Sequence, residues 1–173
     1  MRIELENLEA GRGEFSHLYQ PEELELTDER VGLCGPASLT GDIRASSSEV
    51  FVTGHVKACA QVECDRCLKP IEIPVDSDFS LEYITGTEYE ENRTAELTED
   101  LMSVSIFDGD GIDLDEIVKE QILLAIPARS LCSAECKGFC QKCGAHLNQG
   151  DCGCEEREID PRWAALQALK EGK

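Results

Sequence analysis

The sequence lacks any apolar run long enough to cross a membrane. A transmembrane helix needs roughly 18 or more consecutive apolar residues, and no stretch of the 173-residue chain approaches that length. The opening MRIELENLEAGRGEF carries acidic residues where a secretory signal would carry basic ones, and no apolar segment follows it. We therefore expect a cytoplasmic protein without membrane contact, in a compartment where cysteine thiols stay reduced.

Positive charge is also scarce. The chain has 16 Lys and Arg against 36 Asp and Glu, a net charge of −20. Such a surface repels nucleic-acid phosphates and attracts basic proteins, so we expect no DNA partner and at most a small RNA footprint. Residues 76–116 contain 14 acidic residues and one arginine, whereas residues 127–150 contain three basic residues and one acidic residue. The acidic stretch is either a solvated surface or a mimic of nucleic-acid charge that holds a basic protein.

No catalytic motif is recognisable. The sequence has no phosphate-binding glycine loop, no nucleophile elbow and no carboxylate pair in a distinctive context. The three histidines, His17, His55 and His146, are scattered, and we expect each to be an ordinary polar residue. His146 could replace a cysteine as a metal ligand. We expect no enzymatic activity.

Alternation of apolar and polar residues predicts long strands in the first part of the chain. Small or apolar residues occupy the even positions from Val50 to Val62, and the pattern resumes on odd positions from Ile71 to Tyr83. Two such runs joined by a short turn predict an antiparallel hairpin. Strands of this length usually curve, which indicates a bent sheet or a partial barrel. Residues 2–8 and 101–107 predict further strands, residues 39–45 alternate weakly, residues 11–26 mix turn formers with a helical turn after Pro21, and residues 86–100 predict an acidic loop.

Helix signals dominate the second part. Asp113 is a candidate N-cap with Glu116 at the capping-box spacing, and Pro127 ends that helix. Asp160 and Pro161 predict the start of a C-terminal helix. The expected fold class is α+β: a curved antiparallel sheet or partial barrel with a long hairpin, followed by a helix, a cysteine-rich zinc knuckle and a C-terminal helix. We expect a β-rich region over residues 1–112 and the remainder over residues 113–173, together forming one compact domain.

Six of the ten cysteines lie between residues 132 and 154. The segment CQKCG at 140–144 is typical of a zinc knuckle, because two thiolates three residues apart reach one tetrahedral ion and the glycine permits the turn. The other two ligands lie either upstream or downstream, and spacing alone does not choose. We therefore expect one structural zinc ion bound by four of these six: Cys132, Cys136, Cys140, Cys143, Cys152 and Cys154.

A further pair, Cys64 and Cys67, lies in the hairpin turn. A C-x-x-C is a redox motif, half of a metal site completed by two late cysteines, or a turn without metal. The redox interpretation is least favoured, because a thioredoxin-like pair lies at the start of a helix, whereas this pair joins two predicted strands. Eight cysteines could fill two tetrahedral sites. We expect Cys34 and Cys59 to take no part.

The segments ECDRCLKPIEI, IDLDEIVKEQILLAIP, LCSAECKGFCQKCGAHLNQGDCGC and DPRWAAL follow one another in this order. Over residues 50–170 they make the chain resemble the YceD family, which is named for large-subunit ribosomal RNA accumulation. The resemblance implies a role in making or keeping this RNA, without a known catalytic activity. Some family members lack the late cysteines and keep the hairpin pair, which implies that Cys64 and Cys67 lie nearer the shared function.

Three functions remain open. The first is a non-enzymatic ribosome-biogenesis factor that binds a large-subunit precursor through its ribosomal RNA or a basic ribosomal protein. Its candidate contacts are Arg66, Lys69, Lys137 and Lys142, which lie beside the cysteine turns in the sequence. The second is an acidic protein that holds a basic ribosomal protein. The third is a small thiol oxidoreductase that uses Cys64 and Cys67.

Overall fold

A computed structural model describes residues 1–28, 30–92, 104–107, 110–154 and 162. Its main feature is a six-stranded sheet in the order β2-β4-β5-β6-β7, with β3 paired to β5. The strands of this sheet are β2 (Arg12–Tyr19), β3 (Val31–Leu33), β4 (Ala37–Ala45), β5 (Glu49–Glu63), β6 (Pro70–Thr85) and β7 (Val104–Phe107). A second, two-stranded sheet pairs β1 (Arg2–Glu4) with β8 (Gly111–Asp113), and a 3-10 turn follows β1 at Leu5–Asn7. The helices are α1 (Gly86–Asn92) and α3 (Leu114–Ala125).

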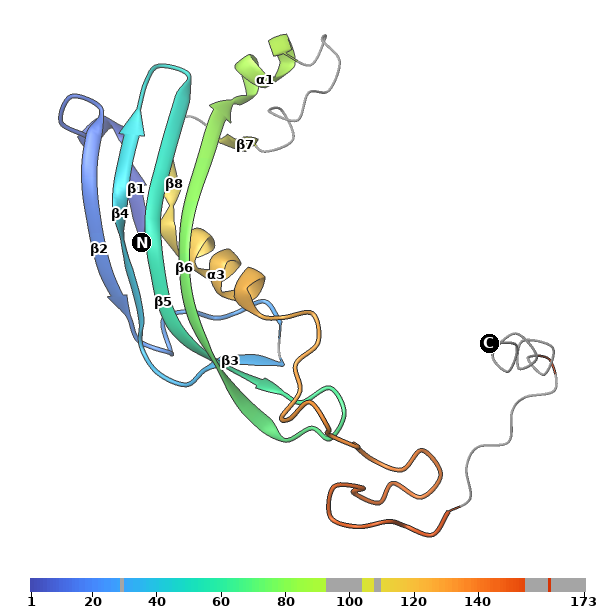
Figure 1. The fold of residues 1–173 in the computed structure, drawn as a ribbon. Helices are drawn as coiled ribbons and strands as arrows, with labels where there is room; N and C mark the ends of the chain where they lie inside the picture. The colour runs from blue at the N-terminus through green and yellow to red at the C-terminus, as the bar shows by residue number, and fades with distance from the viewer. Residues whose placement is uncertain (29, 93–103, 108–109, 155–161, 163–173) are drawn as a thin grey trace.

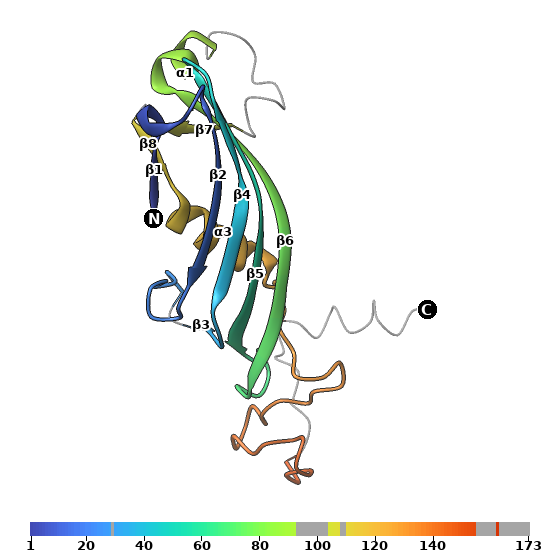
Figure 2. The same ribbon diagram turned by 90° about the vertical axis from the view of Figure 1, so that its left-hand side faces the viewer.

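β5 and β6 dominate the sheet. They pair antiparallel along their length, from Glu49 opposite Ile84 to Glu63 opposite Pro70. The sheet curves as an open layer, and α3 lies on its concave side (Figures 1 and 2). The predicted alternation on β5 is confirmed, since Val50, Val52 and Val56 are fully buried on the face toward the helix.

The hydrophobic core lies between the sheet and α3. Leu114, Ile117 and Ile122 on one face of the helix pack in one core with buried side chains of β5 and β6. Full burial of one such side chain stabilises a fold by about 1.5–3 kcal/mol. The predicted cap is present, because the Asp113 carboxylate accepts a hydrogen bond from Asp115 N at 2.9 Å. The helix therefore begins where the sequence predicted.

The predicted strand over residues 2–8 is shorter than expected, since only residues 2–4 form β1 and a 3-10 turn follows. Three further expectations change. Residues 12–19 form an edge strand instead of a turn-rich segment, with Phe15 and Tyr19 buried. Residues 86–92 form α1 instead of a loop. β7 forms within the predicted strand 101–107 but pairs parallel to β6, so the sheet is not wholly antiparallel. The predicted C-terminal helix and the rest of the acidic loop lie outside the described residues.

The cysteine-rich segment lies beyond one end of the sheet. After α3 the chain runs past the turn between β5 and β6 and continues as an irregular loop (Figure 1). In the part of the chain that the structure describes, no helix is long and apolar enough to cross a membrane.

Candidate metal centres

Eight cysteines form two groups of four. The tether cluster comprises Cys64, Cys67, Cys132 and Cys136, and the local cluster comprises Cys140, Cys143, Cys152 and Cys154. Within each group the four sulfur atoms all lie within 4.8 Å of one another, so each group could hold a metal ion. The knuckle at residues 140–144 thus gathers the downstream pair, while the upstream pair joins the hairpin.

The sulfur spacing matches a tetrahedral ion. In the tether cluster the sulfurs of Cys67 and Cys132 are 3.6 Å apart, and those of Cys64 and Cys136 are 3.9 Å apart. Four sulfurs at the usual zinc–sulfur distance of about 2.3 Å form a tetrahedron with edges of about 3.8 Å. A disulfide would need a separation of about 2.05 Å. The measured distances therefore fit four thiolates around one ion.

The hairpin turn of the tether cluster is a knuckle in its own right. The backbone N–H of Leu68 donates to the carbonyl of Cys64 at 2.9 Å, and the N–H of Cys64 donates to the carbonyl of Lys69 at 2.9 Å. Leu68 has a φ of 57°, which lies in the left-handed region. This turn folds the chain back so that both sulfurs of the pair face the same point.

The local cluster contains the same turn. The N–H of Gly144 donates to the carbonyl of Cys140 at 2.9 Å, and the N–H of Cys140 donates to the carbonyl of Ala145 at 2.8 Å. Gly144 has a φ of +74°, at the position equivalent to Leu68. The glycine made this knuckle visible in the sequence, whereas the leucine concealed the other one.

Hydrogen bonds attach the upstream cysteines to the hairpin. Asp65 and Ser130 are joined twice: Asp65 N donates to the Ser130 carbonyl at 2.9 Å, and Ser130 N donates to the Asp65 carboxylate at 2.6 Å. Cys132 N donates to the sulfur of Cys64 at 3.3 Å. The Arg66 guanidinium donates to the carbonyl of Cys136. These bonds fix the position of residues 130–136 against the hairpin turn. Cys64 and Cys136 are fully buried there.

Asn148 links the two clusters. It lies in the loop of the local cluster, yet its amide nitrogen donates to the sulfur of Cys136 at 3.2 Å. Its amide oxygen accepts from the N–H of Lys137 at 2.7 Å. Between the clusters, Gly138 has a φ of +71°, and a Cβ there would meet the Arg66 carbonyl oxygen at 2.6 Å. A glycine is needed at this crossing because backbone passes directly over backbone.

The thiols within each cluster differ in acidity. Burial opposes ionisation of Cys64, but the N–H groups of Cys132, Arg66 and Cys67 overcome it and lower the pKa of Cys64 to about 6. The N–H groups of Cys143 and Lys142 lower the pKa of Cys140 to about 6. Neighbouring sulfurs raise the pKa of Cys132 and of Cys154 to about 12. Because neighbouring sulfurs oppose ionisation of Cys132 and Cys154, four thiolates in one cluster would require a bound cation to balance their charge.

The remaining two cysteines lie on the sheet. Cys34 and Cys59 form a disulfide with a Cα–Cα distance of 5.4 Å, which differs from the expectation of two uninvolved thiols. Cys34 directly follows β3, which pairs with β5, and Cys34 N donates to the carbonyl of Cys59 in β5 at 2.9 Å. The pair lies beside Glu72 and apart from both clusters.

None of the three histidines joins a cysteine cluster within the described residues. The ring of His55 lies between two carboxylates of β6, 3.0 Å from Asp76 and 2.7 Å from Asp78. His146 packs edge-on against Phe139 with ring centroids 5.1 Å apart. His17 packs against Tyr19.

The four candidate contact residues are exposed and lie around the clusters. Arg66 and Lys69 belong to the hairpin turn, Lys142 lies in the turn of the local cluster, and Lys137 lies between them. The ammonium of Lys137 is 3.7 Å from the carboxylate of Asp151. Their contact with RNA or with a partner stays a prediction. The hairpin turn and the loop 130–154, which carry these residues, are called the cysteine module below.

Comparison with known proteins identifies relatives across bacteria and plants. The chain is similar to an uncharacterised protein of Mycobacterium tuberculosis, 34% identical over 140 residues that cover 80% of this chain and 65% of the relative. The uncharacterised protein YlbN of Bacillus subtilis is 27% identical over 90% of this chain and 87% of its own length. The chain thus spans somewhat less than two thirds of the mycobacterial protein's length.

A plant relative carries a functional name. The large ribosomal RNA subunit accumulation protein YCED homolog 1 of Arabidopsis thaliana, a chloroplastic protein, is 24% identical over 79% of this chain and 49% of its own length. No solved structure matches. The family model for the large ribosomal RNA subunit accumulation protein YceD matches residues 52–170, which include the hairpin knuckle and both clusters. The chain therefore belongs to the YceD family.

Proposed function

We propose that this protein is a non-enzymatic, cytoplasmic ribosome-biogenesis factor that binds a large-subunit precursor, and that a structural zinc ion occupies each cysteine cluster. The family name and the name of the plant relative support a role in ribosome biogenesis in general. The expected partners are the ribosomal RNA of that particle or a basic ribosomal protein within it.

The observation that carries the proposal is the grouping of eight cysteines into two four-thiolate sites. A zinc ion with four protein ligands has no open position for a substrate or an activated water, so such a site maintains structure. The ions would hold the loop after α3 in a fixed shape against the hairpin. The function then belongs to the surface that this module presents.

Charge separates that surface from the rest of the chain. Residues 127–150 carry three basic residues and one acidic residue in a protein of net charge −20. Long-range repulsion between the acidic sheet and RNA favours approach by this end of the molecule. Few phosphates could be neutralised there, so the RNA contact would be small and sensitive to salt.

Sedimentation tests the proposal. The native tagged protein should migrate with large-subunit precursors in a lysate gradient, and ribonuclease should abolish that migration. Elemental analysis of the purified protein should find two zinc ions per chain. A position near the top of the gradient in both runs would reject the particle-bound role.

A second candidate is a thiol oxidoreductase, which the lowered pKa of Cys64 favours. A thiolate near neutral pH is the reactive form of cysteine. Two variants distinguish the oxidoreductase from the biogenesis factor in cells. The double variant Cys64→Ser, Cys67→Ser removes the C-x-x-C pair. The control Cys132→Ser removes a metal ligand but keeps that pair. An oxidoreductase would keep function in the control and lose it in the double variant.

A further inference from the structure

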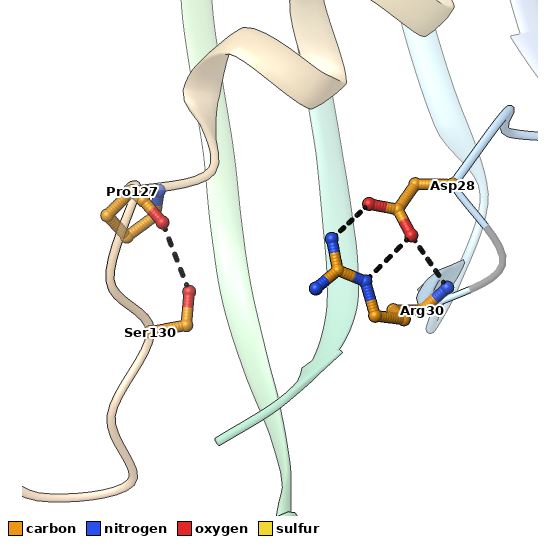
Figure 3. Close-up of polar contacts among 4 residues, drawn as sticks. All are labelled: Asp28, Arg30, Pro127 and Ser130. Atoms are coloured by element: carbon orange, nitrogen blue, oxygen red, sulfur yellow. Dashed lines mark hydrogen bonds and ion pairs between the residues drawn. The ribbon is translucent and has the colours of Figure 1, made fainter. Parts of the chain in front are cut away.

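A groove lies beside the tether cluster. It has a volume of about 420 Å³ and runs between the loop before β3, the end of β5 with the hairpin turn that follows it, and the chain at the end of α3. Its apolar lining comprises Val31, Val62, Leu68, Leu123, Ile126, Pro127 and Ala128. Asp28 and Arg30 stand on one side and Pro127 and Ser130 on the other (Figure 3).

Leu68 is an unusual residue for its position in this groove. Its backbone is in the left-handed region at φ 57°, where a side chain meets the following carbonyl and glycine is favoured. The equivalent residue of the other knuckle is Gly144. Leu68 is 58% exposed, so packing within the chain does not account for a leucine at this position. Strained backbone of this kind is concentrated at ligand-binding positions.

The charged groups at the groove are mainly acidic. Three carboxylates, Asp28, Glu63 and Asp65, line it together with one arginine. The guanidinium of Arg30 is held by Asp28 through hydrogen bonds of 3.1 and 2.8 Å (Figure 3). The Asp65 carboxylate accepts a neutral backbone N–H from Ser130. Glu63 and Asp65 therefore add a net negative charge of two to an apolar groove.

We propose that this groove binds a basic peptide segment that inserts one aliphatic side chain against Leu68. The carboxylates attract lysine or arginine on either side of the anchor and repel phosphate. Among the described residues that line the groove, none is aromatic, so the groove offers no platform for stacking nucleic-acid bases. The inference rests on the proposed function, in that a basic ribosomal protein of the large-subunit precursor would supply the segment.

Two substitutions and a matched control test the groove. Leu68→Gly removes the apolar contact and relieves the backbone, so zinc content and the fold should be unchanged. Glu63→Lys reverses a charge at the groove, whereas Glu14→Lys makes the same change at an exposed position of the edge strand β2. The probe is a labelled 12-residue peptide of lysines and arginines with one central leucine, beside the same peptide with alanine at the centre.

Fluorescence anisotropy of the full chain should show about tenfold weaker binding of the leucine peptide to the Leu68→Gly variant, as expected for loss of one buried apolar contact. Glu63→Lys should weaken binding of both peptides, and Glu14→Lys should leave both near the wild-type value. Equal affinity of the wild type for the two peptides, or full affinity in Leu68→Gly, would overturn the proposal. A different result would be that a large-subunit ribosomal RNA fragment displaces the peptide and binds Leu68→Gly as tightly as the wild type. That result would assign the surface to RNA.

Sedimentation gradients of lysates distinguish failure of the groove proposal from failure of the proposed ribosome-biogenesis role. Wild-type protein that migrates with precursors, together with Leu68→Gly that migrates equally well, would reject the groove and leave the ribosome-biogenesis role intact. Wild-type protein absent from the precursors would reject that role, and the peptide measurements would still decide whether the groove binds basic segments.

Discussion

The two cysteine clusters use the same turn for different purposes. The tether cluster joins the hairpin to a loop 65 residues further along the chain, and its thiols are mostly buried. The local cluster closes within residues 140–154, and Cys143 and Cys154 are exposed. A cross-link removes more entropy from the unfolded chain when it closes a longer loop. An ion in the first cluster would therefore fix tertiary structure, whereas an ion in the second would shape a single loop.

Removal of metal from both clusters should have the largest effect. Binding of a structural zinc ion contributes on the order of 10 kcal/mol to folding of the segment that holds it. Under a strong chelator, amides of residues 128–154 should exchange rapidly with deuterium while β4, β5 and β6 remain protected by the apolar core. A single cooperative loss of protection across the whole chain would contradict this division.

Removing one ligand from each cluster in turn sharpens the comparison. Cys136→Ser should free the loop from the hairpin, since a loop of this length is restrained by about 4 kcal/mol in the chain-entropy model. Cys152→Ser should loosen only residues 140–154. Each variant should lose one zinc ion per chain, and hydrogen exchange at the Asp65 and Ser130 amides should rise only in Cys136→Ser. Equal exchange at those amides in both variants would mean that the clusters do not act separately.

Gly138 and Gly144 both have a positive φ, and a comparison of the two tests the backbone crossing between the clusters. Gly138→Ala should destabilise the module by about 2 kcal/mol or more, because its Cβ would meet the Arg66 carbonyl in addition to the left-handed φ. Gly144→Ala should cost only about 1 kcal/mol, since nothing lies within 4 Å of its Cβ. Zinc retention during titration with a competing chelator measures both. The order would be reversed if the local turn were the more constrained.

Asn148 provides a smaller test of the link. Asn148→Ala removes the donor to the Cys136 sulfur and the acceptor for Lys137, which should lower stability by about 1 kcal/mol. Asn148→Asp keeps the acceptor and places a negative charge beside a thiolate. Zinc in the tether cluster should therefore be lost more readily from Asn148→Asp than from Asn148→Ala, as read by chelator titration. The opposite order would show that the Lys137 bond is the important one.

Leu68→Gly should have the smallest effect on the stability of the fold, and it should raise stability where the other substitutions lower it. It converts the hairpin knuckle to the residue pattern of the local knuckle and relieves strain of about 1 kcal/mol, part of which is offset by the greater freedom of glycine in the unfolded chain. Chemical unfolding should give a midpoint equal to or slightly above that of the wild type. A clear loss of stability would show that the Leu68 side chain packs within the chain.

Periodicity allowed the longest elements to be predicted. The runs beginning at Val50 and Ile71 alternate over enough residues that burial of one face is the only consistent outcome, and β5 and β6 have that alternation. β2 was missed because serine, histidine and two glycines surround Phe15, so its apolar positions are too few to show a period. The parallel pairing of β7 depends on where the chain returns to the sheet, which local sequence does not encode.

The cysteines show a similar limit. Spacing predicted the knuckle at Cys140 because a glycine follows its second cysteine. The equivalent turn at Cys64 has leucine at that place and was left with three interpretations. The choice between upstream and downstream partners depends on the paired bonds between Asp65 and Ser130, which lie 65 residues apart. Such long-range contacts cannot be read from spacing.

The separation of the two halves of the tether cluster also sets an order in time. During synthesis Cys67 leaves the ribosome 65 residues before Cys132, which at roughly 5–20 residues per second is a delay of about 3–13 s. For that interval the hairpin carries an incomplete site, and only a chain elongated beyond Cys136 can close it. Closure of the tether thus reports that translation has passed the helix and the acidic segment, and a prematurely ended chain would keep an open pair of thiols at the tip of its hairpin.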